Sequence, residues 1–346
     1  MKEILPRFYR PLAHQKEDVR MKKFVALFAI VLLAACSGEQ NPVVEEQQEP
    51  AEYFKAICYH PVNVGNTQRS WEYIDQDLDL MQEAGISVIR VYMPITDENV
   101  LDKLAERGMK VITSFGYNQD SVYDLYSGTY LEYVTKYKNH PAIFLWELGN
   151  EYNYHPEWFD GNLMNWYTTL EKAVDAIHAE DTAHLVTTAH GEVPDSTAMY
   201  YGRHLDMWGF NVYRWDLPAS FVADWRSKSD KPFYFSELGA DSYMTIEKDS
   251  LEQGINERAQ AVAVGHIIDE LEPQAHEFEG MTLFSFTDGW WKAGNPEIQD
   301  IGGWAPNSSG VPYDGSPNEE FWGIVNIDRT KKEVFTAVRD RFKKEL

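Results

Sequence analysis

A single-domain (β/α)8 TIM barrel is the fold class that the sequence predicts, and three observations predict it. From residue 53 to residue 346, strand-like and helix-like periods alternate eight times. The strand-like runs are almost continuously apolar, as in parallel strands that are covered on both faces. The segment is also long enough for a barrel, which needs ~250 residues. A doubly wound open sheet is the alternative, but no Gly-rich phosphate turn follows the first strand-like run.

The strand-like runs are short stretches of β-branched and aromatic residues bounded by turn residues. We expect strands over Phe54–His60, Val88–Tyr92, Lys110–Phe115, Ile143–Glu147, Leu185–His190, Trp208–Tyr213, Pro232–Glu237 and Met281–Thr287.

Between these runs, apolar residues recur every three or four positions, which predicts helices. We expect helices over Trp71–Ala84, Val100–Arg107, Leu163–Ala179, Gln253–Leu271 and Thr330–Phe342. Ser70 is an N-cap candidate for the first, and Gly85 and Gly108 end the first two. Two long loops are expected, Glu192–His204 and Gly289–Phe321.

The first 52 residues carry targeting signals rather than a domain. Residues 1–20 show no signal of their own, so we expect an upstream mis-start with Met21 as the biological start. Residues 21–35 have a basic start and a short apolar run, which indicates a signal peptide rather than a permanent span. The run ends in Leu33-Ala34-Ala35-Cys36, a lipobox that predicts cleavage before Cys36 and lipidation of its thiol.

Residues 36–52 are polar, acidic and Gln-rich, as in a flexible tether. The expected location is therefore the bacterial cell envelope, with membrane contact only through the lipid on Cys36. An outer-membrane destination is favoured because Ser37, not Asp, follows the lipidated cysteine. The alternative is a plain secretory signal cleaved after Ala35, which would release the enzyme.

The composition excludes several function classes. The net charge of −24 argues against nucleic acid or anionic membrane as a partner, since both would be repelled. No Cys/His cluster has zinc spacing, no carboxylate run suits calcium, and no Ser lies in a nucleophile elbow. We therefore expect no metal, no cofactor and a monomer. Cys36 and Cys58 are the two cysteines, so no disulfide framework is expected, and Cys58 should be buried in a strand.

Active sites of such barrels lie at the C-terminal ends of the strands. The polar and aromatic residues expected there are His60, Arg90, Tyr92, Asn118, Asn150, Glu151, His190, Tyr213, Glu237 and Trp290. Glu151 and Glu237 each follow a short apolar run, where a carboxylate is costly to bury without a task. A lone Glu would be structural, but a pair on separate strands matches the two carboxyl groups that glycosidic bond hydrolysis needs.

The chain resembles the retaining (β/α)8 glycoside hydrolases of clan A, over roughly residues 53–343. The residues that carry the resemblance are Asn150-Glu151 ending the fourth strand, Ser236-Glu237 ending the seventh, Ile89-Arg90-Val91-Tyr92, Asn211-Val212-Tyr213 and Trp290. It implies that Glu151 is the acid/base and that Glu237 is the nucleophile.

The chemistry assigns further roles around this pair. Arg90 and Tyr213 would stabilise an ionised Glu237, and the pKa of Glu151 should be raised by its surroundings and by the Glu237 charge. Asn150 suits the sugar 2-hydroxyl. Trp290 would stack under the sugar in the −1 subsite.

Three other strand-end residues complete the expected site. His60 and Asn118 are substrate-binding candidates. His190 could bond a sugar hydroxyl or Glu151, or it could be a hydrogen-bonded core histidine. Glu147, four residues before Glu151, is expected to be a structural partner deeper in the barrel.

Three segments resemble the barrels of glycoside hydrolase families 2, 17 and 72: Cys58-Tyr59-His60-Pro61, Ile89-Arg90-Val91-Tyr92 and Phe235-Ser236-Glu237. A standard family 2 exo-glycosidase is less expected, because β-sandwich domains normally precede the barrel in that family. Families 17 and 72 act on β-1,3-glucans. The expected function is therefore a retaining β-glycosidase that hydrolyses a β-glucan, β-1,3-linked for preference, by double displacement. The alternatives are a β-glucan transglycosylase (glucanosyltransferase) and a catalytically inactive glycan-binding lipoprotein.

Overall fold

The computed structural model describes residues 53–117, 122–215, 217–302 and 318–344. The predicted signal peptide, tether and Cys36 lie outside these residues, as does Asn118. Their predicted roles stay predictions.

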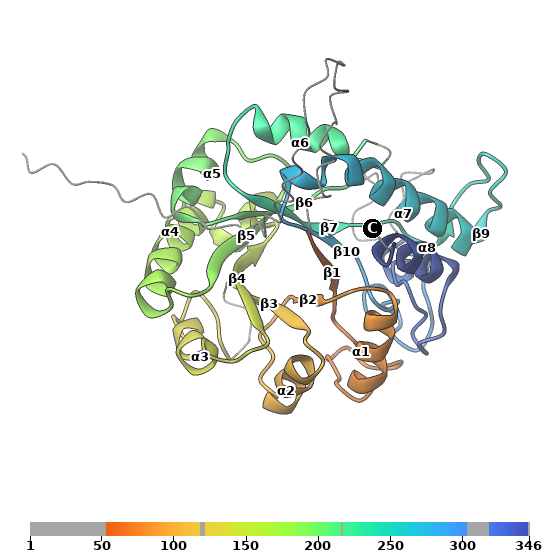
Figure 1. The fold of residues 1–346 in the computed structure, drawn as a ribbon, viewed down its shortest axis with the longest axis horizontal. Helices are drawn as coiled ribbons and strands as arrows, with labels where there is room; N and C mark the ends of the chain where they lie inside the picture. The colour runs from red at the N-terminus through yellow and green to blue at the C-terminus, as the bar shows by residue number, and fades with distance from the viewer. Residues whose placement is uncertain (1–52, 118–121, 216, 303–317, 345–346) are drawn as a thin grey trace, which may run out of the picture. The chain divides into compact units, whose positions relative to one another are not determined.

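Eight parallel strands close into one barrel, which confirms the predicted fold class (Figure 1). The order around the barrel is β1-β10-β7-β6-β5-β4-β3-β2. Each barrel strand therefore pairs with the barrel strands before and after it in the chain, and β1 pairs with β10 to close the barrel. Each strand overlaps its predicted range. The bounds are β1 Phe54–Cys58, β2 Val88–Val91, β3 Lys110–Phe115, β4 Ile143–Asn150, β5 Leu185–Gly191, β6 Trp208–Asn211, β7 Phe233–Leu238 and β10 Gly280–Leu283.

Helices surround the strands as an outer ring (Figure 1). They are α1 Ile74–Glu83, α2 Glu98–Glu106, α3 Tyr130–Tyr137, α4 Leu163–Glu180, α5 Ser196–Tyr201, α6 Ala219–Arg226, α7 Glu257–Leu271 and α8 Glu333–Phe342. Four of them start at side-chain caps, because Asp97, Asn162, Asp195 and Asn256 each accept a hydrogen bond from a backbone N–H in the first turn.

Smaller elements occupy the loops. Two short 3-10 helices, η1 Tyr152–Tyr154 and η2 Pro156–Phe159, follow β4, and three more are η3 Gly202–His204, η4 Glu272–Glu277 and η5 Glu319–Phe321. Strands β8 Tyr243–Met244 and β9 Gly254–Ile255 form a two-stranded antiparallel sheet before α7. The predicted Glu192–His204 loop contains α5, whose N-cap is Asp195.

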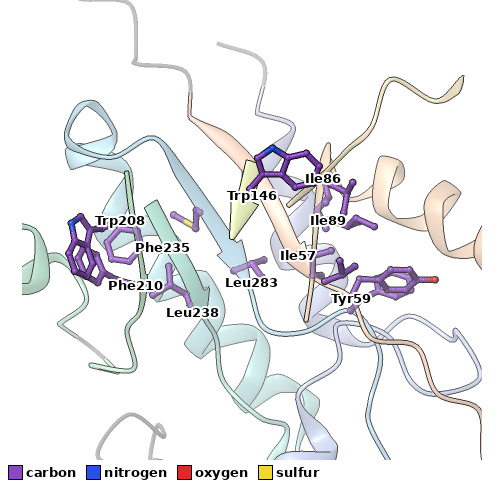
Figure 2. Packing of buried hydrophobic residues seen from close by; sticks show 14 of the residues in the cluster. Ile57, Tyr59, Ile86, Ile89, Trp146, Trp208, Phe210, Phe235, Leu238 and Leu283 are labelled. Atoms are coloured by element: carbon purple, nitrogen blue, oxygen red, sulfur yellow. The ribbon is translucent and has the colours of Figure 1, made fainter. Parts of the chain in front are cut away.

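Two apolar layers hold the barrel together. The interior is filled by a small cluster, Ala56, Val88, Ile112, Leu145, Met207 and Tyr234. The larger layer lies between strands and helices, where Trp208, Phe210 and Phe235 pack on one side and Ile57 and Ile89 on another (Figure 2). Each such side chain contributes roughly 1.5–3 kcal/mol when fully buried. The filled interior leaves the strand ends as the place for a site.

Irregular backbone re-aims the side chains at the ends of β4, β6 and β7. The register between β4 and β5 shifts between Glu147 and Asn150, and that between β6 and β7 shifts between Phe210 and Asn211. Gly149 has φ +69° and Glu151 has φ +54°, both in the left-handed region. Such bulges are enriched next to active sites because they redirect a side chain that strand alternation would send elsewhere.

Two further features concern the described residues alone. Within 53–117, 122–215, 217–302 and 318–344, no helix is long and apolar enough to cross a membrane. Cys58 ends β1 as a buried free thiol, as predicted.

Candidate active site

Arg90 is the hub of the polar network at the strand ends. It projects from β2 and is fully buried. Its Nη1 donates to Glu237 Oε1 at 2.8 Å, and its Nη2 donates to Asn150 Oδ1 at 2.7 Å. Its Nε and Nη2 also donate to the Glu147 carboxylate at 2.8–3.0 Å. One guanidinium therefore connects β2 with β4 and with β7.

Glu237 is the carboxylate with the most donors at the mouth of the barrel. Besides Arg90, the Tyr92 hydroxyl donates to its Oε1 at 2.6 Å and the Tyr213 hydroxyl to its Oε2 at 2.8 Å. The side chain is almost buried, with 6% exposed. Three donors, one of them cationic, fix the orientation of this carboxylate.

Glu151 lies in a different environment, although it belongs to the same site. The pKa of its carboxyl is raised from 4.5 to about 7, mainly by burial and then by the charge of Glu237, while a hydrogen bond with Asn211 and the charge of Arg90 oppose the shift. Arg90 contacts both Glu237 and Asn150, the residue before Glu151, so the ends of β4 and β7 place the two glutamates at the same part of the barrel mouth. A carboxyl group with a pKa near 7 can both donate and accept a proton at neutral pH.

Asn150 is oriented by its neighbours. Its Oδ1 accepts from Arg90 and from Asn211 Nδ2, the latter at 3.1 Å. Asn211 in turn accepts from Ser236 Oγ at 2.7 Å. Because the Asn150 oxygen has two donors, its Nδ2 is the group left to donate to a ligand.

Tyr92 and Asn211 are functional neighbours that the sequence prediction did not assign a role. Their positions at strand ends could have indicated a role in the site, since Tyr92 directly follows β2 and Asn211 ends β6. No other feature of the sequence pointed to them.

Glu147 has the structural role that the sequence predicted. It is fully buried, and it accepts hydrogen bonds from Arg90, Ser114 and Tyr234. All three of these partners are themselves buried.

His60 and Trp290 are two of the predicted substrate-binding residues. The His60 ring packs on Trp291 at 5.1 Å, and burial together with Arg69 and Lys292 lowers the pKa of His60 to about 3, so the ring is neutral. His60 Nδ1 and Trp290 Nε1 are buried and have no hydrogen-bond partner among the described residues. Both atoms are therefore candidates for bonding a substrate.

An aromatic group that the sequence prediction missed contacts Tyr213, one of the donors to Glu237. The Trp322 ring contacts the Tyr213 ring at 5.5 Å and the Phe284 ring at 5.5 Å, and Phe284 directly follows β10. Lys292 Nζ lies 4.0 Å from the Phe284 ring centroid. Phe284 and Trp290 are thus both candidates for the ring on which a sugar would stack.

His190 occupies the outer side of β5. Its ring packs against Trp208, and its Nδ1 lies 2.9 Å from the carbonyl oxygen of Glu192. Trp208 belongs to the apolar layer between strands and helices. Its Nε2 is buried and has no hydrogen-bond partner among the described residues, so a contact with a sugar hydroxyl or with Glu151 stays a prediction beside the core-histidine alternative.

The described residues contain no group of His, Cys, Asp and Glu side chains that could hold a metal ion. What the arrangement offers is acid, base and nucleophile chemistry by two carboxyl groups. A parallel (β/α)8 barrel with paired carboxylates at the ends of β4 and β7 defines a class, the retaining glycoside hydrolases of clan A.

The chain belongs to a particular family of that class. Residues 63–248 match the family described as glycosyl hydrolases family 2, TIM barrel domain. Of the three families that the sequence resembles, this match selects family 2.

Individual proteins similar to this chain are, by their names, glycosidases. The chain is 26% identical over 215 residues to mannan endo-1,4-beta-mannosidase A of Podospora anserina, which covers 51% of this chain and 56% of that protein. The fold is similar to beta-glucuronidase 2 of Bacteroides uniformis, with a TM-score of 0.64 and 18% identity over 86% of this chain. It is also similar to a family 2 beta-galacturonidase of Eisenbergiella tayi, with a TM-score of 0.62 and 18% identity over 85% of this chain. The chain spans about half the length of the mannosidase, and 36% and 52% of the two solved chains.

Proposed function

We propose that this protein is a retaining β-glycosidase, with Glu237 as nucleophile and Glu151 as acid/base. The observation that carries the proposal is the asymmetry of the two carboxyl groups. Glu237 accepts three hydrogen bonds, whereas Glu151 is desolvated and has a pKa of about 7. Two carboxyl groups whose surroundings separate their protonation states are what an acid and a nucleophile require.

In the first step of the proposed reaction, Glu151 protonates the leaving oxygen while Glu237 attacks the anomeric carbon. The glycosidic bond breaks and a glycosyl-Glu237 ester forms. In the second step, ionised Glu151 takes a proton from water, and the water oxygen displaces Glu237 from the anomeric carbon. Asn150 Nδ2 donates to the sugar 2-hydroxyl, a contact that strengthens in the transition state.

The proposed substrate is a neutral β-linked oligo- or polysaccharide. Glu319 contributes to the raised pKa of Glu151, so a further negative charge lies near the acid/base. The net charge of −24 acts in the same direction and disfavours a uronic acid. The relatives named above act, by their names, on mannan, glucuronides and galacturonides, so the predicted preference for β-1,3-glucan draws no support from them.

Hydrolysis and transglycosylation share the first step, and the expected glucanosyltransferase would differ only in using a sugar hydroxyl in place of water. Both are included in one test. Glu237→Ala should abolish turnover of aryl β-glycosides, because no glycosyl-enzyme can form. Added azide should restore part of the activity and yield a glycosyl azide of inverted configuration, measured by NMR of the product.

Glu106→Ala, at an exposed position at the end of α2, is the matched control and should turn over normally. Near-normal turnover by Glu237→Ala would exclude Glu237 as nucleophile. A folded wild-type protein that hydrolyses no β-glycoside in a panel of glucosides, mannosides and glucuronides would favour the glycan-binding alternative.

A further inference from the structure

A small pocket opens beside Asn150, opposite the strand that carries Glu237. Tyr92 and Asn150 line its inner side, Phe115 and Gly116 lie at the end of β3, and Tyr152 and Trp158 form its outer wall. Its volume is about 110 Å³, which corresponds to several water molecules at ~30 Å³ each. Strand β3 lies four places from β7 in either direction around the barrel. The pocket therefore continues the site across its full width.

The shape of the pocket depends on Gly149, where the backbone lies close to the Tyr152 ring because no side chain stands between them. At Gly149, a Cβ atom would lie 2.6 Å from the Tyr152 ring. The Tyr152 hydroxyl accepts the backbone N–H of Tyr117 at 2.8 Å, which connects the β4 side of the pocket to the β3 side. The floor is thus a preformed part of the barrel end.

Exposed aromatic rings continue from the pocket to the surface. Trp158 is 51% exposed, and its indole is stacked on the His155 ring at 3.9 Å with an interplanar angle of 9°. Tyr126 is 67% exposed and packs edge-on against Tyr117. Large apolar rings that are held in place and left exposed mark a ligand face. Flat rings beside a sugar site suit the apolar faces of pyranoses.

The roles proposed for Glu237 and Asn150 determine how a bound sugar would be oriented relative to this aromatic face. A sugar with its anomeric carbon at Glu237 and its 2-hydroxyl at Asn150 Nδ2 has its 3-hydroxyl one ring carbon further on. The pocket lies beside Asn150 at the end of β3, where Gly116 and Phe115 line it, so it is the space into which a substituent on that hydroxyl would extend. We propose that the pocket and Trp158 form a subsite for a second sugar, joined to the 3-hydroxyl of the sugar held between Glu151 and Glu237.

This inference rests on the proposed function, because the roles of Glu237 and Asn150 set the orientation. A small acyl substituent on the same hydroxyl would need the pocket but no exposed platform. The stacked pair of Trp158 and His155 extends beyond the pocket, and a second pyranose is the group that would cover it.

The test compares Trp158→Ala with wild type on three aryl β-glycosides of one sugar: the monosaccharide, the β-1,3-linked disaccharide and the β-1,4-linked disaccharide. We expect kcat/KM for the 1,3-linked substrate to fall about tenfold, the effect of one lost aromatic contact. The loss should be in KM, and the other two substrates should be unchanged. Tyr126→Ala should give a smaller loss with the same selectivity, and Trp158→Phe should recover part of it.

Tyr200→Ala is the matched control, because Tyr200 is 59% exposed on α5, away from the pocket. Equal losses on the 1,3- and 1,4-linked substrates, or none on either, would overturn the subsite. A wild-type enzyme that hydrolyses the 1,4-linked substrate and rejects the 1,3-linked one would also overturn it. Failure of the proposed function is distinguishable, because Glu237→Ala would then leave turnover of all three substrates unaffected.

Discussion

Glu147 and Glu151 are four residues apart in the sequence, Glu147 within β4 and Glu151 directly after it, yet they have opposite surroundings. Glu147 is fully buried and has four donor groups around it from Arg90, Ser114 and Tyr234. Glu151 is desolvated with few donors, and the neighbouring Glu237 charge raises its pKa further. Burial therefore does not decide what a carboxylate does; the number of donors that accompany the burial does.

The largest effect should come from removing the interior carboxylate. Glu147→Ala leaves the buried Arg90 guanidinium without its main partner, and breaking a buried pair in this way costs about 3–5 kcal/mol. Glu151→Ala should leave the free energy of unfolding unchanged or raise it above pH 7, because it removes a desolvated charge. Chemical denaturation followed by tryptophan fluorescence measures both. Equal destabilisation by the two substitutions would remove the distinction between them.

The next effect concerns catalysis and its pH dependence. Glu151→Gln should lower kcat about a hundredfold on substrates with poor leaving groups and spare those with a nitrophenolate, which need little protonation. In wild type, kcat/KM should fall as pH rises through about 7, because the acid form is lost. The variant should lack this limb. A variant profile identical to that of wild type would assign the limb to another group.

The same pKa has a consequence for stability. Since the pKa of Glu151 is about 7 in the folded state and 4.5 in its ordinary state, the folded protein binds more protons between these values. This contribution to stability is fully present below pH 4.5 and is lost as pH rises through 7. The burial-raised pKa of Glu320, also about 7, acts in the same direction.

The smallest effect separates two tyrosines that each donate to a carboxylate. Tyr213→Phe removes one of three donors to Glu237 and should lower kcat/KM about tenfold while leaving the unfolding midpoint in place. Tyr234→Phe removes a donor from Glu147 and should lower the midpoint instead. Steady-state kinetics and denaturation of both variants provide the measurement. A fall in stability for Tyr213→Phe would show that the mouth and the interior are one structural unit.

The barrel and most of its strands could be predicted because buried parallel strands are continuous apolar runs. Helix α3, Tyr130–Tyr137, was missed because its buried face consists of tyrosines, and α6, Ala219–Arg226, because Pro218 precedes it without a side-chain cap. Both helices depend on packing against the barrel, which sequence propensity does not contain.

At the site, the types of residue could be predicted from the sequence, but the directions in which their side chains point could not. The left-handed backbone at Gly149 and Glu151 redirects β4, and nothing in the sequence fixes that bulge. His190 is the instructive case, because Val186 faces the outer apolar layer and strand alternation places residue 190 on the same face. The spacing between Val186 and His190 therefore indicated the face of β5 on which His190 lies.

Arg90 acts as a spacer inside the cylinder. Its guanidinium contacts Glu147 and Asn150 on β4 and Glu237 on β7, all within 3.0 Å. The gap across which a covalent intermediate would form is thus set by a rigid interior part rather than by the surface loops. Loops such as the one carrying Trp158 are then free to diverge, and a change of sugar preference by loop exchange should leave the chemical step intact.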